Sequence, residues 1–130
     1  MNIAPAIYQI LRNTAAITTI VADRIYPDIL PQEEPYPALV HYTEAKDRLA
    51  YTGGTVDTYK INLQIDIYFE VYANGKSLAE SIRGALDKYT GTIGGVNIRS
   101  CYFTSETNNN FIEETKTYLI TQSFLFTTYE

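Results

Sequence analysis

The clearest pattern in the chain is an alternation of apolar and polar residues over residues 59–70, which read YKINLQIDIYFE. Apolar side chains occupy the odd positions from Tyr59 to Phe69, and mainly polar side chains occupy the even positions from Lys60 to Glu70. Successive side chains of a β-strand point to opposite faces. The segment therefore predicts a long strand, ending near Tyr72, with one face on a core and the other face exposed.

Three further segments have strand character. They are residues 38–44 (ALVHYTE), 96–106 (VNIRSCYFTSE) and 114–130 (ETKTYLITQSFLFTTYE). The last segment places apolar residues on one side, namely Tyr118, Ile120, Phe124 and Phe126, opposite a side of Thr and Ser. The chain holds 12 Tyr and many Thr, which fit half-buried pleated surfaces, and this supports a strand-rich protein.

Helical spacing occurs at the N-terminus and again after the long strand. A first stripe, with Asn2 as a cap and Pro5 in the first turn, consists of Ile3, Ile7, Ile10 and Leu11. Thr14 can cap a second short helix that carries Ile17, Ile20 and Val21. A third helix is expected over residues 77–91, because Ser77 and Glu80 match a capping box and Gly91 matches a C-terminal stop.

Loops are expected between these elements. Four of the five prolines lie in residues 27–37, which favours an extended connection. Residues 46–57 and the stretch around 107–110 are polar, and both are predicted to be loops. The elements together indicate an α+β fold: a single domain over residues 1–130, with an antiparallel β-sheet and helices packed on one face.

Composition narrows the function classes. A net charge of −5 argues against a protein that grips nucleic acid through phosphate contacts. The one cysteine, Cys101, excludes an intrachain disulfide and fits a reducing, intracellular setting. Residues 1–21 lack a basic leader and a continuous apolar run, so we expect neither a signal peptide nor a membrane span.

Candidate chemistry is sparse. Gly75-Lys76-Ser77 lacks the second glycine of a phosphate-binding loop, because Glu70 stands at that position. The one histidine, His41, lies in a strand without an evident partner, and Cys101 has no basic neighbour to activate it. We therefore expect no catalytic, cofactor or metal site, and a binding or assembly role rather than an enzyme.

The order of these features resembles the tail completion, or tail terminator, proteins of long-tailed bacteriophages and prophages. The resemblance rests on ITTIVADRIYP at 17–27, PQEEPYPALVHY at 31–42, the strand with Ile65-Asp66, SLAESIRGALDKYTG at 77–91, the GG-x-NI strand at 94–98 and the hairpin at 111–126. Similar sequences often have a Trp near the middle strand, and this chain has none.

The resemblance implies a structural role in the phage tail and neck, with assembly in the bacterial host cytoplasm. Such proteins form a ring, typically hexameric, at the head-proximal end of the tail tube. The ring stops addition of tail tube subunits and offers a docking face to the head connector or head-closure protein. DNA passes through without specific binding, and the family implies no catalytic residue, cofactor or membrane partner.

Two sets of residues are candidates for contacts in such a ring. The loops 46–56 and 104–113 are expected to face partners, since loops commonly carry recognition, and their candidate contacts are Arg48, Leu49, Tyr51, Asn109 and Phe111. The polar strand face is expected to line the lumen or a subunit seam through Gln64, Asp66 and Glu70. Plain solvent exposure and loops without partners are the alternatives.

Other functions stay open at this point. Another head-tail joining component, such as a connector adaptor or a head-closure protein, would share the DNA path and differ in its neighbours. A small hydrolase or ligand-binding domain would need His41, Asp66 or Glu70 to converge in a cleft. A nucleic-acid-binding module is disfavoured by the acidic charge.

Overall fold

The computed structural model describes residues 3–29, 37–48, 58–112 and 117–129. Its helices are α1 (Ala4–Arg12), α2 (Ala15–Val21) and α3 (Tyr72–Leu86). Its strands are β1 (Ile25–Pro27), β2 (Ala38–Arg48), β3 (Thr58–Phe69), β4 (Gly91–Ile93), β5 (Val96–Ile112) and β6 (Thr117–Tyr129). The described strands form one sheet in the order β1-β2-β3-β6-β5-β4.

The sheet is mixed, and the expectation of a purely antiparallel sheet was wrong. Strand β1 pairs with β2 in parallel, whereas every other neighbouring pair of described strands is antiparallel. The amide N–H of Leu39 donates to Arg24 O at 2.9 Å, and the N–H of Asp28 donates to His41 O at 2.9 Å. With only three residues ending in Pro27, β1 gives no alternation to read in the sequence.

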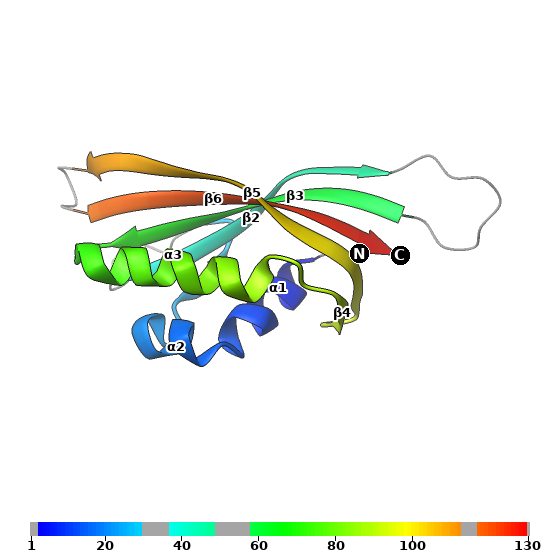
Figure 1. The fold of residues 1–130 in the computed structure, drawn as a ribbon, viewed down its shortest axis with the longest axis horizontal. Helices are drawn as coiled ribbons and strands as arrows, with labels where there is room; N and C mark the ends of the chain where they lie inside the picture. Colours follow the sequence, from blue (N-terminus) through cyan, green and yellow to red (C-terminus); the bar gives the residue numbers. More distant parts are fainter. Residues whose placement is uncertain (1–2, 30–36, 49–57, 113–116, 130) are drawn as a thin grey trace.

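All three helices lie on one side of the strongly twisted sheet, as the sequence predicted (Figure 1). The predicted apolar face of β3 is buried, and it consists of Ile61, Leu63, Ile65, Ile67 and Phe69. The helices contribute their own apolar stripes to the same core, among them Ile7 and Leu11 of α1, Ile17 of α2 and Leu78 and Ile82 of α3. This burial is the main driving force for the fold.

The third helix begins earlier than expected. Its N-terminal cap position is Val71, so Ser77 and Glu80 lie inside α3 and form no capping box. Gly75 explains the early start, because a Cβ there would lie 2.4 Å from the Phe69 ring, and only glycine lets this turn of the helix pack against the end of β3. The helix ends at Leu86, and Gly91 begins β4 instead of stopping the helix.

Two expected loops are partly strand. Residues 46–48 belong to β2, and residues 107–112 continue β5, which pairs with β6 as far as Ile112 and Thr117. Their polar composition resembles a loop, but cross-strand pairing overrides weak local preference. Gly94 and Gly95, at φ +59° and +78°, form the turn that joins β4 to β5.

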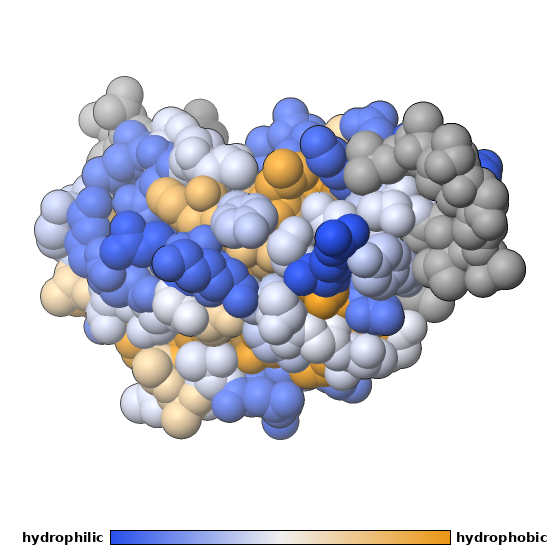
Figure 2. All heavy atoms as spheres, turned by 45° about the vertical axis from the view of Figure 1, so that its right-hand side comes forward, coloured by the Kyte–Doolittle hydropathy of each residue, from blue (hydrophilic) through white to orange (hydrophobic). Residues whose placement is uncertain are grey.

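The surface shows no single large apolar area in the view of Figure 2, where small hydrophobic areas alternate with hydrophilic ones. Among the described residues, the exposed large hydrophobic side chains are Ile29, Val71, Tyr72 and Tyr102. None of the helices in the described ranges is long and apolar enough to cross a membrane.

Candidate functional site

The helices leave one face of the sheet uncovered, and its centre carries a network of polar side chains. The Tyr42 hydroxyl donates to Gln64 Oε1 at 2.5 Å, and Gln64 Nε2 donates in turn to Glu44 Oε2 at 2.5 Å. Beside them, the Thr121 hydroxyl donates to Asp66 Oδ1 at 2.8 Å. These two sets of hydrogen bonds, together called the polar network below, span β2, β3 and β6 and hold two acidic groups, from Glu44 and Asp66, on one surface.

Asp66 is the electrostatically unusual member of this network. It lies opposite Val40 of β2 and Thr121 of β6, and it is half-buried. Burial raises the pKa of the Asp66 carboxyl, while the hydrogen bond from Thr121 opposes the shift. An acidic group held in this way at the middle of an open sheet face repels other anions, including phosphate.

The structure brings together only part of the predicted lumen or seam set. Gln64 and Asp66 share the uncovered face, whereas Glu70 follows the end of β3 and lies outside the hydrogen-bonded network. Sequence reasoning missed Tyr42, Glu44 and Thr121. The available signal was that polar residues recur at alternate positions in three strands that become neighbours.

The predicted partner-contact residues do not form one loop surface. Arg48 is exposed at the end of β2, while Asn109 and Phe111 belong to β5 rather than to a loop. Leu49 and Tyr51 lie outside the described residues. The roles of all five in partner contact stay predictions.

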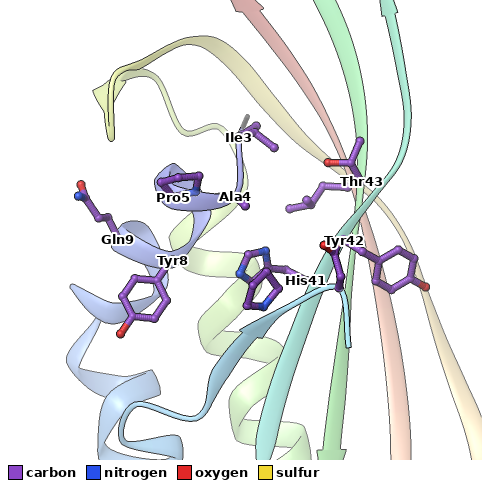
Figure 3. Close-up of a pocket in the computed structure, with 11 residues that line it drawn as sticks. Ile3, Ala4, Pro5, Tyr8, Gln9, His41, Tyr42 and Thr43 are labelled. Atoms are coloured by element: carbon purple, nitrogen blue, oxygen red, sulfur yellow. The ribbon is translucent and has the colours of Figure 1, made fainter. Parts of the chain in front are cut away.

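The helix side of the sheet contains a cavity of about 530 Å³ between the start of α1, the end of β1 and the middle of β2. Most of its lining is apolar, including Ile3, Ala4, Pro5, Pro27 and Leu63, and its polar lining includes Gln9, Asp28, His41 and Thr43. Figure 3 shows the His41 ring directed from β2 toward α1, with Tyr8 beyond it, while the Tyr42 ring points away.

His41 is the polar group at the floor of this cavity. It is 2% exposed, and neither ring nitrogen has a hydrogen-bond partner among the described residues. Burial lowers its pKa to about 4, although the Asp28 carboxylate acts in the opposite direction. The imidazole is therefore neutral near pH 7, with one nitrogen able to donate and the other able to accept a hydrogen bond.

The structure does not bring His41 and Asp66 together in a cleft, as the hydrolytic alternative would require. His41 pairs with Ile65 on the covered face, whereas Asp66 is on the uncovered face, so these side chains lie on opposite sides of the sheet. Cys101 is buried, and burial raises the pKa of its thiol, which suppresses the reactive thiolate. Gly75-Lys76-Ser77 lies within α3 and forms no phosphate loop. Within the described ranges, no cluster of side chains could hold a metal ion.

The segment Asp23–Pro27, part of the family resemblance, has a structural role. Arg24 Nε donates to Pro37 O at 2.9 Å, and one of its terminal nitrogens donates to Ile20 O at 3.2 Å. One guanidinium thus ties the end of α2 to the start of β2, and it holds β1 against its parallel neighbour. The planar fork of arginine suits such a double contact better than lysine.

Comparison with known proteins agrees with the resemblance. The family model described as tail completion protein gp17 matches residues 5–129. No curated protein matches the chain in sequence. A solved chain from a structure titled "Virion of native gene transfer agent (GTA) particle" is 16% identical with a TM-score of 0.74, and the alignment covers 95% of this chain and 92% of that chain. At this identity, the likeness shows a shared fold.

Proposed function

The chain belongs to the family of tail completion protein gp17 and is a structural component of phage-type virions, and from this premise we propose that it caps the tail tube as a ring. The ring, hexameric as the family resemblance implies, sits at the head-proximal end of the tube. There it stops addition of tail tube subunits and offers a docking face to the head connector or head-closure protein.

The uncovered sheet face is the observation that carries this proposal. A monomeric domain commonly exposes one side of an antiparallel sheet, but here that side has an ordered polar network with two acidic groups. We assign this face to the lumen. Its acidic character lets DNA pass without being held, because affinity for DNA backbone comes from Lys and Arg contacts to phosphate.

The proposed ring must dock to two partners, the tail tube and the head connector. Docking to tube and connector needs surfaces at the two ends of the ring, for which Arg48, Asn109 and Phe111 at strand ends remain candidates, together with Leu49 and Tyr51. The ring can form from free protein when that protein binds the tube, in the bacterial host cytoplasm. A role as connector adaptor or head-closure protein would instead require binding to the connector in the absence of tubes.

A tube-capping assay tests the proposal. Purified tail tubes are mixed with the protein, and electron microscopy counts tubes with a terminal ring, while elongation is followed after addition of tail tube protein. We expect rings at one end and arrested elongation. Binding to purified connectors but never to tubes would contradict capping and favour the head-closure role.

The lumen assignment has its own charge-reversal test. The double substitution Glu44→Lys and Asp66→Lys introduces cations on the uncovered face, so phages assembled with it should release DNA more slowly, with infectivity reduced on the order of tenfold. The control is Thr19→Lys, which adds a lysine on the exposed side of α2 and should leave infectivity unchanged. Equal infectivity of the folded double variant and the control would contradict the lumen assignment.

A further inference from the structure

The cavity beside His41 has the properties of a receptor for one side chain of a partner. Its volume of about 530 Å³ falls within the range of small-molecule binding pockets. It is lined mainly by apolar groups, yet the imidazole at its floor offers a donor and an acceptor that no described residue uses. Leaving such a buried group unpaired costs free energy, so an occupant with a hydroxyl group would relieve that cost.

The same chain carries a protrusion that matches this cavity. At the start of α3, Val71 is 57% exposed and Tyr72 is 58% exposed, which is unusual for adjacent large side chains. The Tyr72 ring is held in place by an edge contact with Tyr118 at 6.4 Å and by Lys76 Nζ at 5.5 Å from its centroid. A side chain that is already ordered loses little entropy on binding, and Tyr is enriched among energetically dominant interface residues.

The charges around the two features are complementary. Asp28 lines the cavity and is exposed, whereas Lys76 lies beside Tyr72 on the protrusion. Opposite charges at the rim of an interface steer association and suppress wrong partners. A tyrosine flanked by lysine therefore suits this cavity better than an acidic peptide does.

The protrusion and the cavity cannot meet within one molecule. In Figure 1, α3 begins at the left end of the helix layer, whereas α1, whose first turn lines the cavity, begins toward its right end. Two complementary patches at different places on one chain produce head-to-tail association, and such an interface closes into a ring when the rotation permits.

We propose that the cavity beside His41 receives the Tyr72 side chain of a neighbouring copy of this chain, and that this contact joins successive copies in the ring. This proposal rests on the proposed ring and identifies the contact between neighbouring copies, called the seam below. Tyr72 enters past Asp28, its hydroxyl forms a hydrogen bond with one of the two His41 ring nitrogens, and Lys76 of the same copy pairs with Asp28 of the next. The uncovered sheet face takes no part, so it stays available to the lumen.

Photo-crosslinking tests the seam on capped tail tubes. Tyr72 is replaced by the photoreactive p-benzoylphenylalanine, and Tyr102, which is 54% exposed on the uncovered face, is replaced in the matched control. Illumination of the Tyr72 variant should yield chain dimers, and mass spectrometry should place the link in residues 3–9 or 41–43 of the second copy. The control should give no link to those residues.

Other outcomes overturn the inference in distinguishable ways. Capped tubes with no dimers, with a link within one chain, or with a link to the tail tube protein would reject the seam and leave the capping function intact. Failure to cap tubes with wild-type protein would reject the proposed function and the seam together.

A charge exchange provides an independent measurement. Asp28→Lys and Lys76→Asp should each lower the fraction of ringed tubes, on the order of tenfold, because like charges then meet at the seam. The double variant should restore the fraction close to that of the wild type. Folding is checked by thermal unfolding of each variant, and a double variant that folds but assembles no better than the single variants contradicts the pairing.

Discussion

At the scale of single residues, His41 is the clearest departure from an ordinary core. A buried imidazole that forms no hydrogen bond with the described part of the chain reduces the stability of the isolated protein. Its neighbours along β2, Leu39 and Val40, are buried apolar residues. This cost to stability is expected if the imidazole serves to hydrogen-bond an occupant of the cavity and not to pack the core.

His41 also gives the chain a measurable pH dependence. Its pKa falls from 6.5 in the unfolded chain to about 4 in the folded one, so the unfolded state binds the proton first as pH decreases. Stability is then lost between pH 6.5 and 4, by about 2–3 kcal/mol at pH 4.5. Urea unfolding at pH 7 and pH 4.5 measures this loss. The His41→Leu variant should lose less unfolding free energy between these two pH values, and the difference from the wild type should equal the loss assigned to His41. Parallel pH profiles for the two proteins would contradict this assignment.

At the scale of elements, the contact between α3 and β3 depends on a missing side chain. Gly75→Ala places a methyl group 2.4 Å from atoms of the buried Phe69 ring, so we expect a loss of about 1–3 kcal/mol in unfolding free energy. Gly84→Ala is the matched control, since no atom lies within 4 Å of its added Cβ. That substitution should raise stability by about 0.5–1 kcal/mol. Equal effects, measured by denaturant unfolding, would show that α3 does not pack as described.

The elements also show what the sequence can predict. The alternation in β3 identified its buried face correctly because both neighbours, β2 and β6, run its full length and one face is covered by helices. The C-terminal part of β5, residues 107–112, was missed because it contains Asn108, Asn109 and Asn110. Asn has weak strand preference, and only pairing with β6 makes this segment a strand. The start of α3 was misplaced because the role of Gly75 depends on Phe69, which is a tertiary contact.

The same distinction between local sequence pattern and tertiary contact applies to the candidate sites. Gln64 and Asp66 could be placed on the polar face from periodicity alone. Their partners Tyr42 and Thr121 depend on which strands are neighbours, and a single sequence does not reveal strand order. The cavity beside His41 combines α1, β1 and β2, so no local pattern marks it.

At the scale of the whole molecule, the acidic balance sets how the proposed ring treats DNA. A hexamer of chains with a net charge of −5 carries six times that charge, or −30. A polyanion of this kind should leave DNA unshifted in a gel assay even at low salt, where electrostatic binding is strongest. A shift that disappears as salt is raised would contradict the lumen assignment and favour a DNA-binding role.

In the proposed ring at the end of the tail tube, the polar face of the sheet faces the channel and the helices face outward. Electron cryomicroscopy of tail tubes capped by this protein measures that orientation directly. We expect six copies with Gln64 and Asp66 facing the channel and α1, α2 and α3 on the outside. A map with the helices lining the channel, or with a single copy attached to the tube wall, would contradict it.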